Sequence, residues 1–105
     1  MAEFVKVAET GDVPVGALRA CAVGGAPVVL ANVDGRLYAF GGACTHDEGP
    51  LAEGDLDGDR VTCPWHFSVF DVKTGEVVES PAEDAVPTYE VRTEGTSVYV
   101  GPARG

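Results

Sequence analysis

The chain has 105 residues and a mass of 10.9 kDa, which is the size of one small domain and excludes a two-domain enzyme with its own cofactor fold. Hydrophobic residues make up 45% of the chain and charged residues 23%, so the chain can bury a core and is not disordered. Seventeen acidic residues against seven basic ones give a formal net charge of −10, which excludes nucleic acid and anionic membranes as partners and favours a partner with a basic patch.

Three further properties of the sequence restrict the cellular location and the fold class. No run of about 18 apolar residues is present to span a membrane, and residues 1–9 lack the apolar stretch of a secretory leader, so we expect a cytoplasmic protein. Three cysteines, an odd number, favour metal binding or thiols over a disulfide framework. Fourteen glycines and seven prolines indicate many turns, which is typical of an all-β fold.

The predicted elements are short strands joined by turns, because apolar residues alternate with polar ones or cluster in short segments between Gly, Pro and Asp. The predicted strands are, in chain order, residues 4–7, 18–23, 28–33, 36–40, 61–63, 68–71, 76–79, 89–92 and 97–100. A single helical turn at residues 13–18 or 83–86 is the most helix that the sequence allows. Strands of this number and length predict a small antiparallel β-sandwich or barrel.

Two hairpins are predicted from their turns. Asp34-Gly35 joins two of the strands and suits a type I′ turn, because Asp and Gly tolerate the positive φ angles that this turn requires. The second hairpin is predicted around Glu94-Gly95. Residues 41–58 show no strand pattern, and a loop of this length in a small domain is typical of a functional segment.

The segment from Asp47 to Asp59 carries six carboxylates and no Lys or Arg. A merely solvated surface and a docking site for a basic partner are equal alternatives for this segment. Its alternating Asp residues do not form a calcium loop, because the twelfth position counted from Asp55 is His66 and not the Glu that such a loop needs.

Both histidines and two of the three cysteines lie in two short motifs, Cys44-Thr45-His46 and Cys63-Pro64-Trp65-His66. Each motif supplies one thiolate and one imidazole from a loop beside a predicted strand. Two Cys and two His suit either one tetrahedral zinc ion or a [2Fe-2S] cluster with both thiolates on one iron and both imidazoles on the other. Catalysis by a Cys44–His46 pair is disfavoured, because a catalytic cysteine and its histidine are usually remote in sequence.

The C-x-H and C-x-x-H motifs, with sixteen residues between them, resemble the ligand motifs of the Rieske iron–sulfur family, and more closely its small soluble ferredoxins. The matching residues are Cys44-Thr45-His46, Gly49-Pro50-Leu51, Gly54-Asp55-Leu56, Gly58, Val61, Cys63-Pro64-Trp65-His66 and Phe70-Asp71. The resemblance implies one domain over residues 1–105, with a β base domain from the two ends of the chain and a loop-rich cluster-binding subdomain at about 42–71. It also implies one Rieske-type [2Fe-2S] cluster, with Cys44 and Cys63 on one iron and His46 and His66 on the other.

The same resemblance implies the function. Similar ferredoxins carry single electrons from an NAD(P)H-dependent reductase to a terminal ring-hydroxylating oxygenase, so we expect an electron-transfer component that acts as a monomer and is not itself an enzyme. The chain has no G-x-G-x-x-G fingerprint for a dinucleotide, so its electrons must come from another protein. Two alternatives remain open: the small Rieske subunit of assimilatory nitrite reductase and a zinc-stabilised binding module.

Four further residues carry more specific expectations. The resemblance places Ser68 and Phe70 where high-potential members have a Ser and a Tyr that donate hydrogen bonds to sulfur, and Phe70 lacks the hydroxyl. Fewer donors predict a midpoint potential at the low end of the Rieske range, which runs from about −150 to +300 mV. Trp65 is expected to shield the cluster from water, and Cys21 to be a small buried apolar residue.

Overall fold

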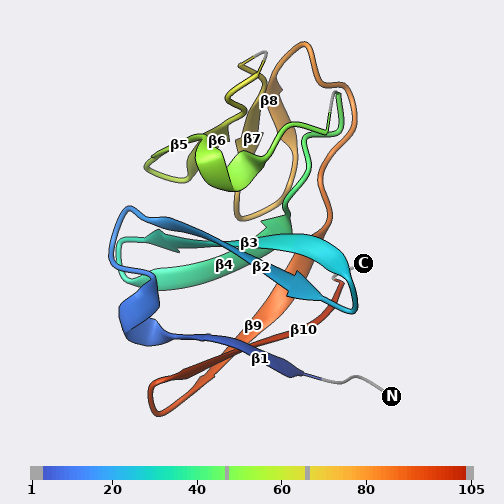
Figure 1. The fold of residues 1–105 in the computed structure, drawn as a ribbon. Coiled ribbons are helices and arrows are strands. Elements are labelled where there is room, and N and C mark those ends of the chain that lie inside the picture. The colour runs from blue at the N-terminus through green and yellow to red at the C-terminus, as the bar shows by residue number, and fades with distance from the viewer. Residues whose placement is uncertain (1–3, 47, 66, 104–105) are drawn as a thin grey trace.

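The computed structural model describes residues 4–46, 48–65 and 67–103. These residues form ten strands in two layers, with two short 3₁₀ turns and no α-helix among them (Figure 1). The lower sheet contains β1 (Val5–Glu9), β2 (Leu18–Val23), β3 (Ala26–Val33), β4 (Arg36–Gly41), β9 (Thr88–Glu94) and β10 (Ser97–Ala103). The upper sheet contains β5 (Asp55–Asp57), β6 (Arg60–Thr62), β7 (Val69–Asp71) and β8 (Val77–Glu79). No helix in the described ranges is both long and apolar enough to cross a membrane.

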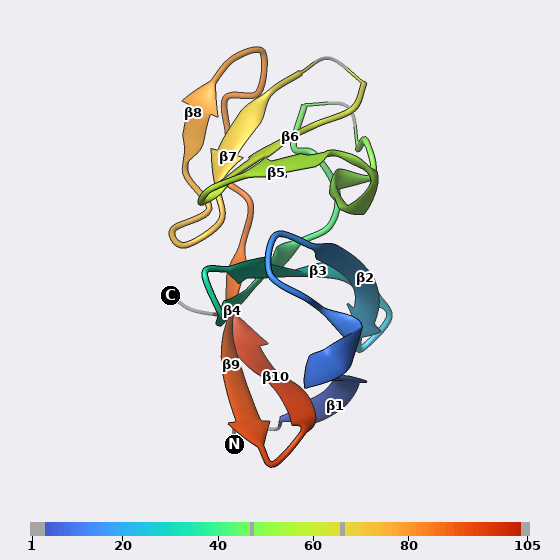
Figure 2. The ribbon, with the colours of Figure 1, turned by 90° about the vertical axis from the view of Figure 1, so that its left-hand side faces the viewer.

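The lower sheet is built from the two ends of the chain. Its strand order is β1-β10-β9-β4-β3-β2 with antiparallel pairing throughout, and its two edge strands approach each other, so the sheet nearly closes into a barrel (Figures 1 and 2). The upper sheet has the order β5-β6-β7-β8. The prediction of an all-β fold with a small antiparallel base is confirmed.

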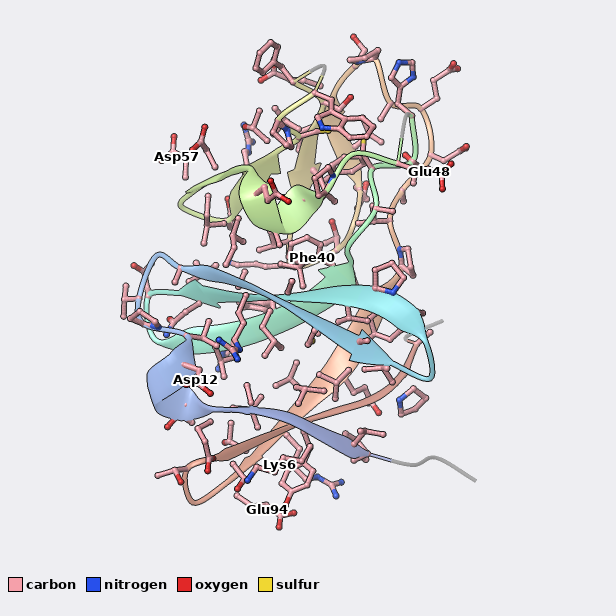
Figure 3. All side chains as sticks on the ribbon, in the orientation of Figure 1. Lys6, Asp12, Phe40, Glu48, Asp57 and Glu94 are labelled. Atoms are coloured by element: carbon pink, nitrogen blue, oxygen red, sulfur yellow. The ribbon has the colours of Figure 1, made fainter. Side chains whose placement is uncertain are left out.

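Strand β3 shows why the two layers stay together. Successive side chains of a strand point to opposite faces, and the buried residues of β3 divide accordingly. Val28 and Leu30 belong to the core inside the barrel, whereas Val29 and Ala31 belong to the core under the upper layer. Phe40 of β4 is fully buried and lies between the two layers (Figure 3). The barrel therefore supplies a rigid floor for the upper layer.

The hairpin of β3 and β4 forms as predicted. Asp34 and Gly35 have φ angles of 53° and 95°, the positive pair that a type I′ turn requires. The buried Asn32 fixes this turn, because its Oδ1 accepts a hydrogen bond of 2.8 Å from the Gly35 N–H. The Asn32 amide also donates to the Val13 carbonyl at 2.7 Å, which ties the segment before β2 to the hairpin.

The last hairpin, β9 with β10, forms as predicted, but its turn lies one residue later than predicted, at Gly95-Thr96, since Ser97 pairs with Glu94. Gly95 has a positive φ of 61°, which glycine adopts without strain. Two other local predictions were wrong. The helical turns lie at η1 (Thr10–Asp12) and η2 (Leu51–Glu53), not at 13–18 or 83–86. Residues 41–58 are not all loop, because Asp55–Asp57 forms β5, with Leu56 opposite Val61 of β6.

Candidate metal centre

The two cysteine motifs form loops with the same hydrogen-bond pattern. We call residues 44–49 loop 1 and residues 63–68 loop 2. In loop 1 the Cys44 N–H donates to the Gly49 carbonyl at 2.9 Å, and the Glu48 N–H donates to the Cys44 carbonyl at 2.7 Å. In loop 2 the Cys63 N–H donates to the Ser68 carbonyl at 2.8 Å, and the Phe67 N–H donates to the Cys63 carbonyl at 3.1 Å. Each loop is therefore a closed six-residue turn that begins at its cysteine.

The backbone angles show the same correspondence. The fifth residue of each loop has a positive φ, 61° at Glu48 and 65° at Phe67, although neither residue is Gly. Such a conformation costs on the order of 1–3 kcal/mol and persists only where surrounding contacts enforce it. Antiparallel pairs close both loops from outside, Ala43 with Pro50 and Thr62 with Val69. Loop 2 is thus flanked by two paired strands of the upper sheet, and loop 1 by an isolated bridge of the same antiparallel kind.

Burial separates the thiols from the imidazole that the structure describes. Cys44 is 1% exposed and Cys63 is fully buried, and both belong to the core between the layers. His46 is exposed. His66, like Asp47, lies outside the described residues. Trp65 is 54% exposed, so at most part of its ring can shield a cluster from water. Phe67, which follows His66 in the sequence, is 68% exposed.

This arrangement fits the donor set of a Rieske cluster. The two cysteines are thiols, and apolar side chains such as Leu51, Val61 and Phe70 share their core. Two buried thiols and an exposed imidazole, on loops of equal size, are the donor types that such a cluster takes. Among the residues that the structure describes, which leave out His66, no three His, Cys, Asp or Glu side chains gather closely enough to hold a metal ion.

Residues 80–87, which we call the strap, connect β8 to β9 and contact both loops. Ser68 is fully buried, and its Oγ accepts a hydrogen bond of 3.0 Å from the Ala82 N–H. Thr45 Oγ1 donates to the Asp84 carbonyl at 2.6 Å. Sequence patterns gave no indication of either bond, because the partners are 14 and 39 residues apart.

The acidic segment does not form one patch at the loops. Asp55 and Asp57 are exposed on β5, and Figure 3 places Asp57 and Glu48 on opposite sides of the upper layer. Asp59 pairs with Lys73 at 3.7 Å. Of the acidic residues in the described part of the segment, only Glu48 belongs to a motif loop.

The third cysteine lies apart from the loops. Cys21 is on β2 of the barrel and is partly buried against the barrel core, so the expectation of a small apolar residue holds in part. Burial raises the pKa of the Cys21 thiol above its ordinary value, and the charge of Arg19 partly opposes that shift.

Similarity to known proteins agrees with this site. The sequence profile of the Rieske [2Fe-2S] domain matches residues 3–90. Ferredoxin CarAc of Metapseudomonas resinovorans is 37% identical over 98 residues, which cover 92% of each chain. The biphenyl dioxygenase ferredoxin subunit of Pseudomonas sp. (strain KKS102) is 37% identical over 102 residues, covering 96% of this chain and 94% of that subunit. Human apoptosis-inducing factor 3 is 34% identical, but this chain spans only 16% of its length.

Solved structures show the same fold. The ferredoxin of carbazole 1,9a-dioxygenase from Nocardioides aromaticivorans IC177 superposes with a TM-score of 0.90 at 31% identity, covering 94% of this chain and 97% of that one. A chain in the complex of reduced oxygenase and oxidized ferredoxin in carbazole 1,9a-dioxygenase gives 0.87 at 37% identity, covering 92% and 91%. The chain therefore belongs to the Rieske [2Fe-2S] family, and its cofactor is one Rieske-type [2Fe-2S] cluster.

Proposed function

We propose that this protein is the ferredoxin of a multicomponent oxygenase system, which carries single electrons from an NAD(P)H-dependent reductase to a terminal ring-hydroxylating oxygenase. The proposal is supported by relatives that are named as ferredoxin components of dioxygenase systems and match this chain over nearly their whole length. The bound cluster supplies one-electron redox chemistry, and the protein itself transforms no substrate. The alternatives of a nitrite reductase subunit and a zinc module are not favoured by these relatives.

We assign Cys44 and Cys63 to one iron of the cluster and His46 and His66 to the other. The observation that supports the assignment is the pair of matching loops, each with its cysteine buried in the shared core. For His66, the support is its place in the C-x-x-H motif. The ligand-bearing subdomain in this proposal is residues 42–71.

The assignment gives the chain's own residues distinct tasks. The buried thiols would bind on the inner side, where apolar neighbours exclude water from the sulfur atoms. The exposed His46 would bind on the outer side, where it offers a short path for an electron to the surface. The antiparallel backbone pairs that close both loops would keep these groups in place when the charge changes.

Spectroscopy of the purified holoprotein tests the ligand assignment. We expect a reddish-brown protein with two iron atoms and two acid-labile sulfides per chain, and a reduced EPR signal of low average g, because two imidazoles bind one iron. His46→Ala should abolish that signal, whereas Cys21→Ala, which removes a cysteine outside the loops, should preserve it. A colourless protein with one zinc ion, or a normal signal from His46→Ala, would contradict the assignment.

Reconstituted electron transfer tests the function. With an NAD(P)H-dependent reductase and a terminal ring-hydroxylating oxygenase, product formation should require this chain and should rise with its concentration. The matched control is His46→Ala, which is expected to support no turnover because its electron path is lost. Equal product formation with and without the chain would reject the proposed place between these two partners.

A further inference from the structure

Strands β4 and β9 are neighbours in the lower sheet but pair at only one end. The paired positions are residues 39–40 of β4 and 88–89 of β9. The same register would next place Leu37 opposite Val91, yet these two residues, both among those that the structure describes, do not pair. Figures 1 and 2 show the β9–β10 hairpin leading away from β4. The lower sheet therefore opens between β4 and β9, at the end next to the β3–β4 turn.

The main-chain groups of three residues point into this opening. In a two-residue hairpin the residues that flank the turn exchange hydrogen bonds, and hydrogen-bonded positions then alternate along each strand. Leu37 is the second residue after the β3–β4 turn, so its N–H and C=O point away from β3. Thr93 is the second residue before the β9–β10 turn, so its main chain, like that of Val91, points away from β10. The opening is therefore bordered by strand edges whose hydrogen-bonding groups are not used by β3 or β10.

A hollow of about 390 Å³, which we call the barrel hollow, lies at the opening and is lined by residues of η1, β3, β4 and β9. Small-molecule sites in proteins occupy about 300–1,000 Å³, so this volume is enough for a small ligand. None of the described residues that line it belongs to a motif loop or to the strap. The barrel hollow is therefore separate from the site of the proposed cluster ligands.

The walls of the barrel hollow combine an apolar side with hydroxyl groups. Leu37 and Val91 are partly buried and pack against the core inside the barrel. Thr10 and Thr93 line the hollow from η1 and β9, and each hydroxyl can donate one hydrogen bond. The Thr10 N–H donates to the Thr96 carbonyl at 2.8 Å, which fixes η1 against the β9–β10 hairpin. A ligand here would meet both apolar surface and hydrogen-bond donors.

Arg36 gives the barrel hollow its charge. Among the described residues that line the hollow, only Arg36 is charged, and it is exposed. None of the ion pairs or ring contacts that the structure describes involves Arg36. A second hollow of about 250 Å³ shares Leu37 and Val91, but the one charged residue among its described lining is Glu90. The barrel hollow therefore suits an anion, and the second hollow does not.

The net charge of −10 does not exclude an anion from the barrel hollow. Residues 1–41 and 88–105, which supply the lower sheet, contain six acidic and five basic side chains, a net charge of −1. The remaining net charge of −9 belongs to residues 42–87. Attraction by the Arg36 guanidinium at short range therefore outweighs the weak repulsion from the rest of the barrel.

We propose that the barrel hollow binds a small organic carboxylate. The Arg36 guanidinium donates to the carboxylate, in the two-bond arrangement that Arg forms with such groups. The Thr10 and Thr93 hydroxyls supply further donors, and the apolar part of the ligand lies against Leu37 and Val91. A bound molecule bridges β4 and β9 where the sheet itself does not, so it stabilises the barrel. The site depends neither on the cluster nor on the proposed role in electron transfer.

Benzoate is the probe for this site, because it joins one carboxylate to a small apolar ring. Titration of the isotope-labelled holoprotein should shift the amide NMR signals of Leu37, Val91 and Thr93 saturably, with a dissociation constant of about 1 mM or below. The amide of Val23, which pairs with Ala26 at the far end of β3, should not shift. Benzamide has the same shape without the charge and should bind at least about tenfold more weakly, because hydrogen bonds between charged groups are the stronger ones. Benzoate should also raise the melting temperature of the holoprotein more than benzamide does.

Two substitutions test the role of the guanidinium. Arg36→Gln should weaken benzoate binding at least about tenfold, the loss expected for a hydrogen bond between charged groups. Arg19→Gln is the matched control and should bind as the wild type does, because Arg19 is also exposed but lies on β2 outside the hollow. No saturable shift, equal binding of benzoate and benzamide, or wild-type affinity of Arg36→Gln would overturn the proposal. The comparison of benzoate with benzamide uses the unaltered protein, so it decides the question even if a variant fails to fold.

Discussion

At the scale of single residues, the Cys21 thiol predicts a pH dependence of stability and of alkylation that does not involve the cluster. Burial raises the pKa of its thiol, so the folded chain releases this proton at a higher pH than the unfolded chain does. The thiol therefore stabilises the fold fully below the unfolded pKa, and this contribution is lost as the pH rises through the folded pKa. Alkylation of Cys21 by iodoacetamide should reach its half-maximal rate at a higher pH in the holoprotein than in urea.

The charge of Arg19 supplies the control for that measurement. Arg19 opposes the raised pKa, so Arg19→Gln should move the half-maximal pH of alkylation still higher. Arg92→Gln, on β9, should leave it unchanged. An equal or lower half-maximal pH in the folded protein would show that burial does not control this thiol.

Residue patterns predicted the chemistry of the site better than its conformation. The motifs around Cys44 and Cys63 located the two loops, because the types of potential donor residues and their spacing can be read from the local sequence. The positive φ angles of Glu48 and Phe67 could not be predicted, since neither is a residue that favours this conformation. The hydrogen bonds that Thr45 and Ser68 form with the strap could not be predicted either, because each depends on a distant segment that folding brings close.

At the scale of elements, the end of the strap depends on Gly75 in the turn between β7 and β8. Gly75 has a φ of 80°, and a Cβ there would overlap the carbonyl oxygen of Val86. Gly75→Ala should therefore destabilise the fold by at least about 1–3 kcal/mol, the usual cost of such a strained backbone. Urea unfolding should show a lower midpoint with little change in slope.

Gly11→Ala is the matched control for Gly75→Ala. A Cβ at Gly11 meets nothing within 4 Å, so this change should have little effect on the urea midpoint. Equal midpoints for the two variants would mean that the contact between the strap and this turn does not contribute to stability.

Strands were predicted correctly where the apolar pattern of the local sequence is enough to identify them. The β3–β4 hairpin has an apolar run at residues 28–31 and the turn pair Asp34-Gly35, and the predictions from both agree with the structure. Strand β5 was missed because Asp55-Leu56-Asp57 has one apolar residue, and Asp is rare in strands. What makes it a strand is pairing with β6, in which Leu56 lies opposite Val61. Local propensity cannot supply such a contact.

At the scale of the whole molecule, the negative charge is concentrated in the upper layer. Residues 42–87 contain eleven acidic and two basic side chains, a net charge of −9, whereas the remaining residues contain six and five, a net charge of −1. The molecule measures 38 × 30 × 19 Å, so its two ends are further apart than the Debye length of about 10 Å at 0.1 M salt. A partner that approaches the upper layer therefore encounters nearly all of the net charge.

This asymmetry predicts how reduced protein reacts with small oxidants. Oxidation by cationic hexaamminecobalt(III) should slow as ionic strength rises from about 0.01 to 0.15 M, because screening weakens attraction to the upper layer, and oxidation by anionic ferricyanide should accelerate. Glu83→Gln removes one exposed charge from the strap and should slow the reaction with the cationic oxidant about twofold at low salt. Glu94→Gln changes the net charge equally at the far end of the barrel (Figure 3) and should have a smaller effect. Equal effects of the two substitutions would mean that only total charge matters, and rates independent of salt would leave the acidity with no role in electron transfer.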